Sequence, residues 1–110
     1  MATKLTTNDL TRGEKLALLR RRENLRQEES ALRFNVSRDT YHKWENDINS
    51  TAPSLEVDDL AVHEVCYILR RRARLTQKQL ASYIGTSRVT VNRMEKGEAP
   101  AFLLANYWEV

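Results

Sequence analysis

The sequence contains an internal repeat: residues 9–47 and 59–97 align without a gap at an offset of 50, and 14 of the 39 aligned positions are identical. A duplicated segment of this size predicts a duplicated supersecondary unit. We therefore expect two small modules instead of one continuous domain. The first covers residues 9–47, a linker covers 48–58, and the second module covers 59–110 together with an additional C-terminal helix.

Helix signals place about three short helices in each copy, so the expected fold class is all-α. Thr11 and Glu14 form the S/T-x-x-E pattern of a capping box, which predicts a helix over 12–22. In the second copy, Thr76 is the expected N-cap of a helix over 77–83. Gly85 allows a tight turn, Thr86 or Ser87 caps the next helix, and that helix, over 87–96, ends at Gly97.

A last helix is expected over residues 101–108, after Pro100. Its sequence, AFLLANYW, is too apolar to remain unpacked in water. It therefore covers a core or forms an interface. The second use predicts a homodimer through Phe102, Leu103, Tyr107 and Trp108.

Charge is distributed unevenly between the copies. Residues 9–47 carry nine basic and eight acidic side chains, whereas residues 59–97 carry eight basic and only three acidic ones. The second copy is therefore the stronger candidate for binding an anionic partner. No apolar stretch approaches the roughly 20 residues of a membrane span, which predicts a cytoplasmic protein.

The composition also argues against several kinds of site. The chain has one cysteine and two histidines, so no metal-ligand set or disulfide is expected. Cys66 takes the place of core residue Leu16 in the other copy. No nucleophile–base pair or phosphate-binding glycine loop is present, and we expect neither a cofactor nor an enzymatic activity.

Two helices joined by a short turn with glycine give the helix-turn-helix layout, in which the second helix enters the DNA major groove. Residues 75–81 (LTQKQLA) and 84–97 (IGTSRVTVNRMEKG) resemble the phage repressor and Cro family, also called the XRE family. The first copy resembles it more distantly over residues 25–45, and this copy departs from the family's pattern at Ser30, Asn35 and Asp47. The resemblance implies a sequence-specific double-stranded DNA-binding transcriptional regulator, of the repressor type found in phages or bacteria.

Helical periodicity predicts which side of residues 87–96 is exposed. If Val91 and Met94 point into the core, the outward face follows from the helical spacing. Arginine pairs well with guanine, asparagine with adenine, and valine with a thymine methyl group. The resemblance adds Gln77 as a residue that clamps the backbone phosphate and a neighbouring base contact. The predicted DNA-binding set is Gln77, Ser87, Arg88, Val89, Asn92, Arg93 and Lys96.

The equivalent surface of the first copy leaves two interpretations open: a second DNA-contacting surface, or a surface that only supports or dimerises. Asp39 is unfavourable beside phosphates, although a carboxylate can accept from cytosine. Tyr41 and Trp44 occupy the positions of Val91 and Met94, and we expect them in the core. The residues of this candidate surface are Gln27, Ser37, Arg38, His42 and Lys43, with Asp39 and Asn46 beside them.

The resemblance further implies structural ion pairs between Arg20 and Glu45 and between Arg70 and Glu95, at identical separations in the two copies. Losing one partner of such a buried pair is costly. A second class of function also stays open, because fold alone does not determine function. The near-neutral first copy and the apolar C-terminal segment favour a protein-interaction module, such as an adaptor, an antitoxin-like protein or an inhibitor.

Overall fold

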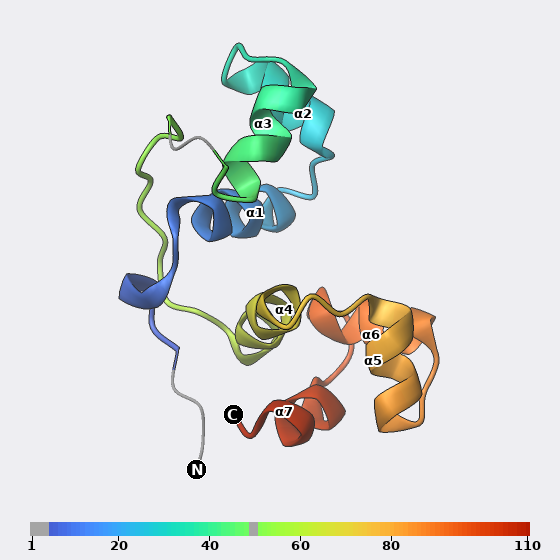
Figure 1. Ribbon diagram of the computed structural model, residues 1–110. Helices are drawn as coiled ribbons and strands as arrows, with labels where there is room; N and C mark the ends of the chain where they lie inside the picture. The colour runs from blue at the N-terminus through green and yellow to red at the C-terminus, as the bar shows by residue number, and fades with distance from the viewer. Residues whose placement is uncertain (1–4, 49–50) are drawn as a thin grey trace. The chain divides into compact units, whose positions relative to one another are not determined.

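The computed structural model describes residues 5–48 and 51–110 (Figure 1). These residues form α-helices and a short 3₁₀ turn at Thr7–Asp9, and no strand, which confirms the all-α class. They divide into two compact units, Thr6–Asp59 and a second that contains Leu60–Val110.

The first unit contains α1 (Arg12–Arg22), α2 (Gln27–Arg33) and α3 (Arg38–Glu45). The capping box predicted at Thr11 is present, since the Thr11 hydroxyl accepts from the Glu14 amide and the Glu14 carboxylate accepts from the Thr11 amide. The core joins Leu16, Ala31, Tyr41 and Trp44. Tyr41 and Trp44 are therefore core residues, as expected.

The chain that follows α3 packs onto the first unit. The Trp44 indole N–H donates to the Thr51 hydroxyl at 2.9 Å, and Arg12 donates to the Ala52 carbonyl at 3.3 Å. Ala52 is buried in the same core, with Leu55 beside it. The predicted linker over 48–58 is therefore packed on the first unit along residues 51–55, while residues 49 and 50 lie outside the described residues.

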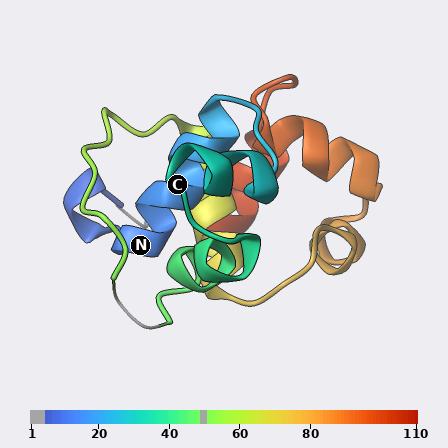
Figure 2. The same cartoon turned by 90° about the horizontal axis from the view of Figure 1, so that it is seen from above.

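The second unit contains α4 (Val62–Arg72), α5 (Gln77–Ile84), α6 (Arg88–Glu95) and α7 (Phe102–Trp108). Figure 2 shows α5 nearly end-on and α6 from the side, so their axes cross steeply. The core consists of Cys66, Leu80, Ala81, Val91, Met94 and Leu104. Burial, together with the nearby negative charge of Glu95, raises the pKa of the Cys66 thiol to about 11, so this cysteine is a neutral packing residue at pH 7.

Helix α7 covers the core of its own unit. It lies beside α4 (Figures 1 and 2), with Leu104 fully buried and Leu103 and Trp108 packed around it. Phe102 and Tyr107 are exposed, at 61% and 40%. Of the two uses considered for this segment, the structure shows the first, and it assigns two of the four proposed dimer residues to packing within the unit.

Chain reversals occur at equivalent positions in the two units. Left-handed backbone is found at Asn24 and Arg74, at Asn35 and Gly85, and at Asp47 and Gly97. The predicted roles of Gly85 and Gly97 are confirmed by φ values of +74° and +76°. The two units thus share their turn geometry at these positions, although glycine is present at these turns only in the second unit.

Candidate nucleic-acid interface

The turn between α5 and α6 sets the direction in which α6 leaves. The Thr76 hydroxyl accepts from the Gln79 amide at 3.0 Å and begins α5. Gly85 reverses the chain, and the Thr86 amide then donates to the Ala81 carbonyl at 2.9 Å. The Ser87 hydroxyl accepts from the Thr90 amide at 3.2 Å, so Ser87, and not Thr86, is the N-cap of α6.

One side of α6 is buried and the other is open to solvent. Val91, Met94 and Glu95 are at most 2% exposed. The predicted DNA-binding residues Ser87, Arg88, Val89, Arg93 and Lys96 are exposed, whereas Asn92 and Gln77 are half-buried. The structure therefore places five of the seven predicted residues on the open surface and the other two at its edge.

The exposed surface of α5 and α6 is cationic. The acidic side chain in these helices is Glu95, which is 1% exposed. Exposed basic side chains come from Lys78, Arg88, Arg93 and Lys96. Three of these cations lie within α5 and α6, whose residues include no exposed carboxylate, and Lys96 directly follows α6. Such a surface attracts a polyanion, and the attraction weakens as salt is added.

Buried ion pairs anchor the third helix of each unit. Arg70 Nε donates to Glu95 Oε2 at 2.6 Å, and the Arg70 guanidinium also donates to the Leu75 carbonyl at 2.8 Å. In the first unit Arg20 makes the same contacts to Glu45, at 2.6 Å, and to the Leu25 carbonyl, at 3.0 Å. The structure thus contains both expected pairs, which are structural groups and not free cations.

The glutamine at the start of the second helix belongs to the same network. Gln77 Nε2 donates to Glu95 Oε1 at 3.0 Å and to Asn92 Oδ1 at 3.2 Å. Gln27 Nε2 donates to Glu45 Oε1 at 3.1 Å. The amide nitrogen of each glutamine therefore faces the protein, so any DNA contact by its side chain falls to the amide oxygen.

The candidate surface of the first unit differs in charge. Ser37, Arg38 and His42 are exposed, but Lys43 is half-buried and pairs with Asp39 at 3.2 Å. The Asn46 amide bonds to the His42 carbonyl at 2.9 Å. One of its cations is therefore already paired with a carboxylate.

Acidic residues also occupy the start of α2. The Glu29 carboxylate accepts from the Arg26 amide at 2.8 Å, and this backbone hydrogen bond lowers the Glu29 pKa. Arg26 is paired with Glu28 at 3.3 Å. The corresponding α5 residues are Lys78 and Gln79. Phosphate is thus disfavoured at the start of α2 but not at the start of α5.

Tyr83 is a surface residue that the sequence analysis did not single out. It lies near the end of α5 and is 61% exposed, as is Val89 at the start of α6. Its position off the Leu80–Ala81–Ile84 stripe is the sequence signal that identifies it as outward-facing. An exposed tyrosine next to a cationic surface is a further candidate contact residue.

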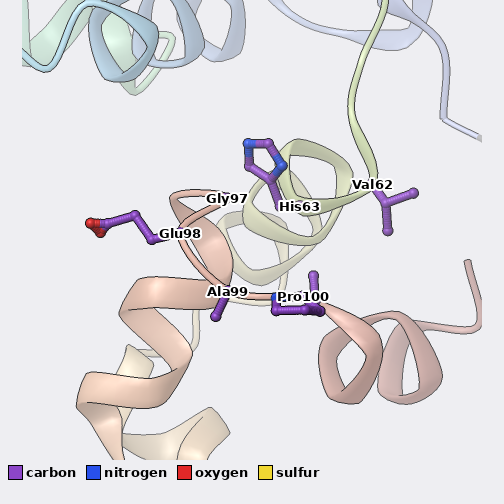
Figure 3. Close-up of a pocket in the computed structure, with 7 residues that line it drawn as sticks. Val62, His63, Gly97, Glu98, Ala99 and Pro100 are labelled. Carbon is purple, nitrogen blue, oxygen red and sulfur yellow. The ribbon is translucent and has the colours of Figure 1, made fainter.

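An open hollow of about 450 Å³ lies where α6 is followed by the turn to α7 (Figure 3). It is lined by Val62, His63 and residues 97–101. His63 and Glu98 are its ionisable side chains. Within residues 5–48 and 51–110, no group of three or more His, Cys, Asp or Glu residues can hold a metal ion. No helix of the described chain is long and apolar enough to cross a membrane.

Comparisons with curated proteins and with solved structures give no significant match. A family model matches residues 67–104, a range that starts within α4 and ends within α7, and it does not extend to the first unit. Residues 67–104, which contain the whole of α5, the turn and α6, are thus similar to the family described as Helix-turn-helix.

Proposed function

We propose that the chain is a sequence-specific transcriptional regulator that binds double-stranded DNA, of the repressor type found in phages or bacteria. Helix α6 enters the major groove. The observation that carries this proposal is the exposed face of α5 and α6, which is cationic while their acidic residue Glu95 is buried. The family match to residues 67–104 supports the same assignment.

Each exposed side chain of α6 has a suitable partner on DNA. Arg88 and Arg93 can each donate two hydrogen bonds to guanine O6 and N7, a contact worth about 1–3 kcal/mol of discrimination. Val89 can contact a thymine methyl group. Ser87 and Lys96 lie at the two ends of the helix, where phosphates flank the groove. The first unit supports the second and is not the principal DNA-binding surface.

A homodimer of the second unit would place two copies of α6 on a palindromic site. Exposed Phe102 and Tyr107 are the apolar side chains of α7 available for this contact, since Leu103 and Trp108 pack inward. Light scattering tests this part separately: Phe102→Ser should convert a dimer into a monomer. A wild-type monomer at DNA-binding concentrations contradicts it.

The test of DNA binding is a selection on random DNA followed by affinity measurements at several salt concentrations. Arg88→Ala and Arg93→Ala should each weaken binding about tenfold or more. Arg38→Ala, at the position of Arg88 in the first unit, is the matched control and should leave affinity within about threefold. Absence of binding at low salt by the wild type, or equal losses for Arg38 and Arg88 variants, contradicts the proposal.

A protein-interaction role is the second candidate. The observation in its favour is the apolar surface of the first unit, where Leu32 is 80% exposed, Ile48 50% and Phe34 36%. A stoichiometric protein partner that is released by Leu32→Ser and that binds in the absence of DNA would favour this role. Failure of Leu32→Ser to release such a partner would count against it.

A further inference from the structure

Val89 is an exposed apolar side chain on the cationic surface of α5 and α6. It lies in the first turn of α6, directly after Arg88, and is 61% exposed. The apolar residues of this helix that face the core are Val91 and Met94. Among the described residues, neither the core of the second unit nor the apolar side chains packed against it include Val89. Packing within the second unit therefore does not account for this residue.

The stability of α6 does not account for Val89 either. Valine loses side-chain freedom in a helix, and it ranks below alanine and the long charged residues as a helix former. A negative charge stabilises the first turn of a helix. The first unit has one at this position: the Asp39 side chain is 76% exposed and pairs with Lys43 at 3.2 Å. The second unit lacks this stabilisation and presents an apolar side chain to solvent instead.

The polar groups around Val89 leave one arginine available. The hydroxyls of Ser87 and Thr90 lie 3.0 Å apart, and the Ser87 hydroxyl also accepts from the Thr90 amide at 3.2 Å. Ser87 is thus engaged in capping α6. Glu95, the carboxylate of α5 and α6, is buried against Arg70 at 2.6 Å. The exposed guanidinium of Arg88 therefore meets no carboxylate from these two helices.

An arginine next to an aliphatic side chain fits a guanine next to a base that carries a methyl group. The guanidinium donates to guanine O6 and N7, whereas an aliphatic side chain packs on the C5-methyl group of thymine. Consecutive residues have Cα atoms about 3.8 Å apart, which is close to the spacing of about 3.4 Å between successive base pairs. Arg88 and Val89 can therefore contact neighbouring base pairs of one site.

A valine recognises the methyl group and not the base that carries it. Thymine and 5-methylcytosine present the same C5-methyl group in the major groove, but thymine has the O4 acceptor where cytosine has an amino donor. A side chain must be polar to distinguish an acceptor from a donor. Val89 is not polar, so it makes the same contact with either base.

We infer that Val89 binds a pyrimidine C5-methyl group, so that 5-methylcytosine can replace thymine in the DNA site and methylation of that cytosine strengthens binding. The chemistry shared by the two bases is a methyl group beside the guanine that Arg88 contacts. The inference rests on the proposed DNA binding of the second unit, and it adds a ligand and a means of regulation to that function.

Base analogues in the site obtained by selection on random DNA test the inference with the full chain. Uracil in place of each thymine in turn removes the methyl group and nothing else. One such replacement should weaken binding about fourfold, which corresponds to the burial of one methyl group. At the same position, 5-methylcytosine should bind about fourfold more tightly than cytosine. Equal ratios for the two pairs of bases show that the methyl group is recognised independently of its base.

Val89→Ser is the matching variant of the protein. Serine forms helices about as well as valine, and position 89 is exposed, so the variant should keep the thermal stability of the wild type. It should reduce both ratios to less than about twofold. Asp39→Ser, the equivalent change in the first unit, should leave both ratios unchanged. Wild-type ratios in Val89→Ser overturn the inference, as does an equal reduction by Asp39→Ser.

The remaining outcomes separate the inference from the function on which it rests. Tight binding to a selected site in which no thymine is sensitive to uracil overturns the inference and leaves the proposed function intact. A loss with uracil but no gain with 5-methylcytosine also overturns it, because a polar group then recognises the base at that position. Absence of wild-type binding to any DNA at low salt overturns the proposed function and the inference together.

Discussion

In the first unit the start of α1 packs against the end of α3, and in the second unit the start of α4 packs against the end of α6. The glycine of this contact is at the start of the first helix in one unit and after the third helix in the other. In the first unit, the Asp47 carboxylate accepts from the Gly13 amide at 2.9 Å and from the Thr11 hydroxyl at 2.6 Å. Position 13 has no room for a side chain, because a Cβ there would lie 2.5 Å from the Trp44 and Glu45 carbonyl oxygens.

In the second unit the large residue is on the other helix. His63 is at the position of Gly13, and Gly97 is at the position of Asp47. A Cβ on Gly97 would lie 2.9 Å from His63 Cε1. Figure 3 shows these two residues together at the start of α4. One backbone geometry thus accepts either arrangement, provided that one of the two positions is a glycine.

The buried ion pairs should stabilise the two units equally, and their loss should cause the largest fall in stability. Glu45→Ala and Glu95→Ala each leave a largely buried arginine without its carboxylate. Each should lower the free energy of unfolding of its unit by about 3–5 kcal/mol. Urea unfolding followed by the fluorescence of Trp44 in the first unit and Trp108 in the second measures both losses.

The exposed pair between Arg33 and Glu23 is the control for these variants. Its side chains are 58% and 57% exposed, and they approach to 2.9 Å. Glu23→Ala should change stability by less than about 1 kcal/mol. A loss of stability for Glu45→Ala as small as that of the control would show that the ion pair between Arg20 and Glu45 does not stabilise the first unit.

Gly13→Ala should disrupt the close contact between the start of α1 and the end of α3. The added Cβ would meet two carbonyl oxygens of the backbone, so α1 and α3 must move apart, at a cost of about 1–3 kcal/mol. The matched change in the second unit, His63→Ala, removes atoms beside Gly97 and should cost less. Equal stability of Gly13→Ala and the wild type in thermal unfolding would contradict the close approach.

Local signals in the sequence predicted the helix ends well, because caps and left-handed turns depend on neighbouring residues. The predicted helices over 12–22 and 77–83 differ from α1 and α5 by at most one residue. The family resemblance supplied the ion pairs. Long-range partners could not be predicted, because nothing local shows that Asp47 meets Gly13 across 34 positions or that Ala52 enters the first core.

The same limit applied to the candidate interface. Periodicity placed Arg88, Val89 and Arg93 outward, and the structure leaves them exposed. The half-burial of Asn92 and its bond to Gln77 depend on how α5 and α6 cross. The ion pair between Asp39 and Lys43 has the i, i+4 spacing of helix neighbours and could have been predicted from it.

Asp47→Ala tests the hydrogen bonds that Asp47 accepts from the Thr11 hydroxyl and the Gly13 amide. It removes an acceptor for the first turn of α1, while the Thr11 hydroxyl continues to accept from the Glu14 amide at 3.1 Å. The loss should be about 0.5–2 kcal/mol, which is the usual range for a helix cap. Glu98→Ala, an exposed acid that follows the same turn in the second unit, should have little effect in the same urea titration. Equal effects of the two variants would show that the Asp47 contacts contribute nothing specific.

The smallest expected effect comes from the other shared turn and has the opposite sign. Arg74 has a φ of +57°, and Asn24, its equivalent in the first unit, has a φ of +60°. Left-handed backbone is unfavourable for arginine and tolerated by asparagine, whereas glycine adopts it without a Cβ penalty. Arg74→Gly should therefore stabilise the second unit by up to about 1 kcal/mol, and Asn24→Gly should change the first unit less. Destabilisation by Arg74→Gly in urea would show that the arginine side chain stabilises this turn by more than its strained backbone costs.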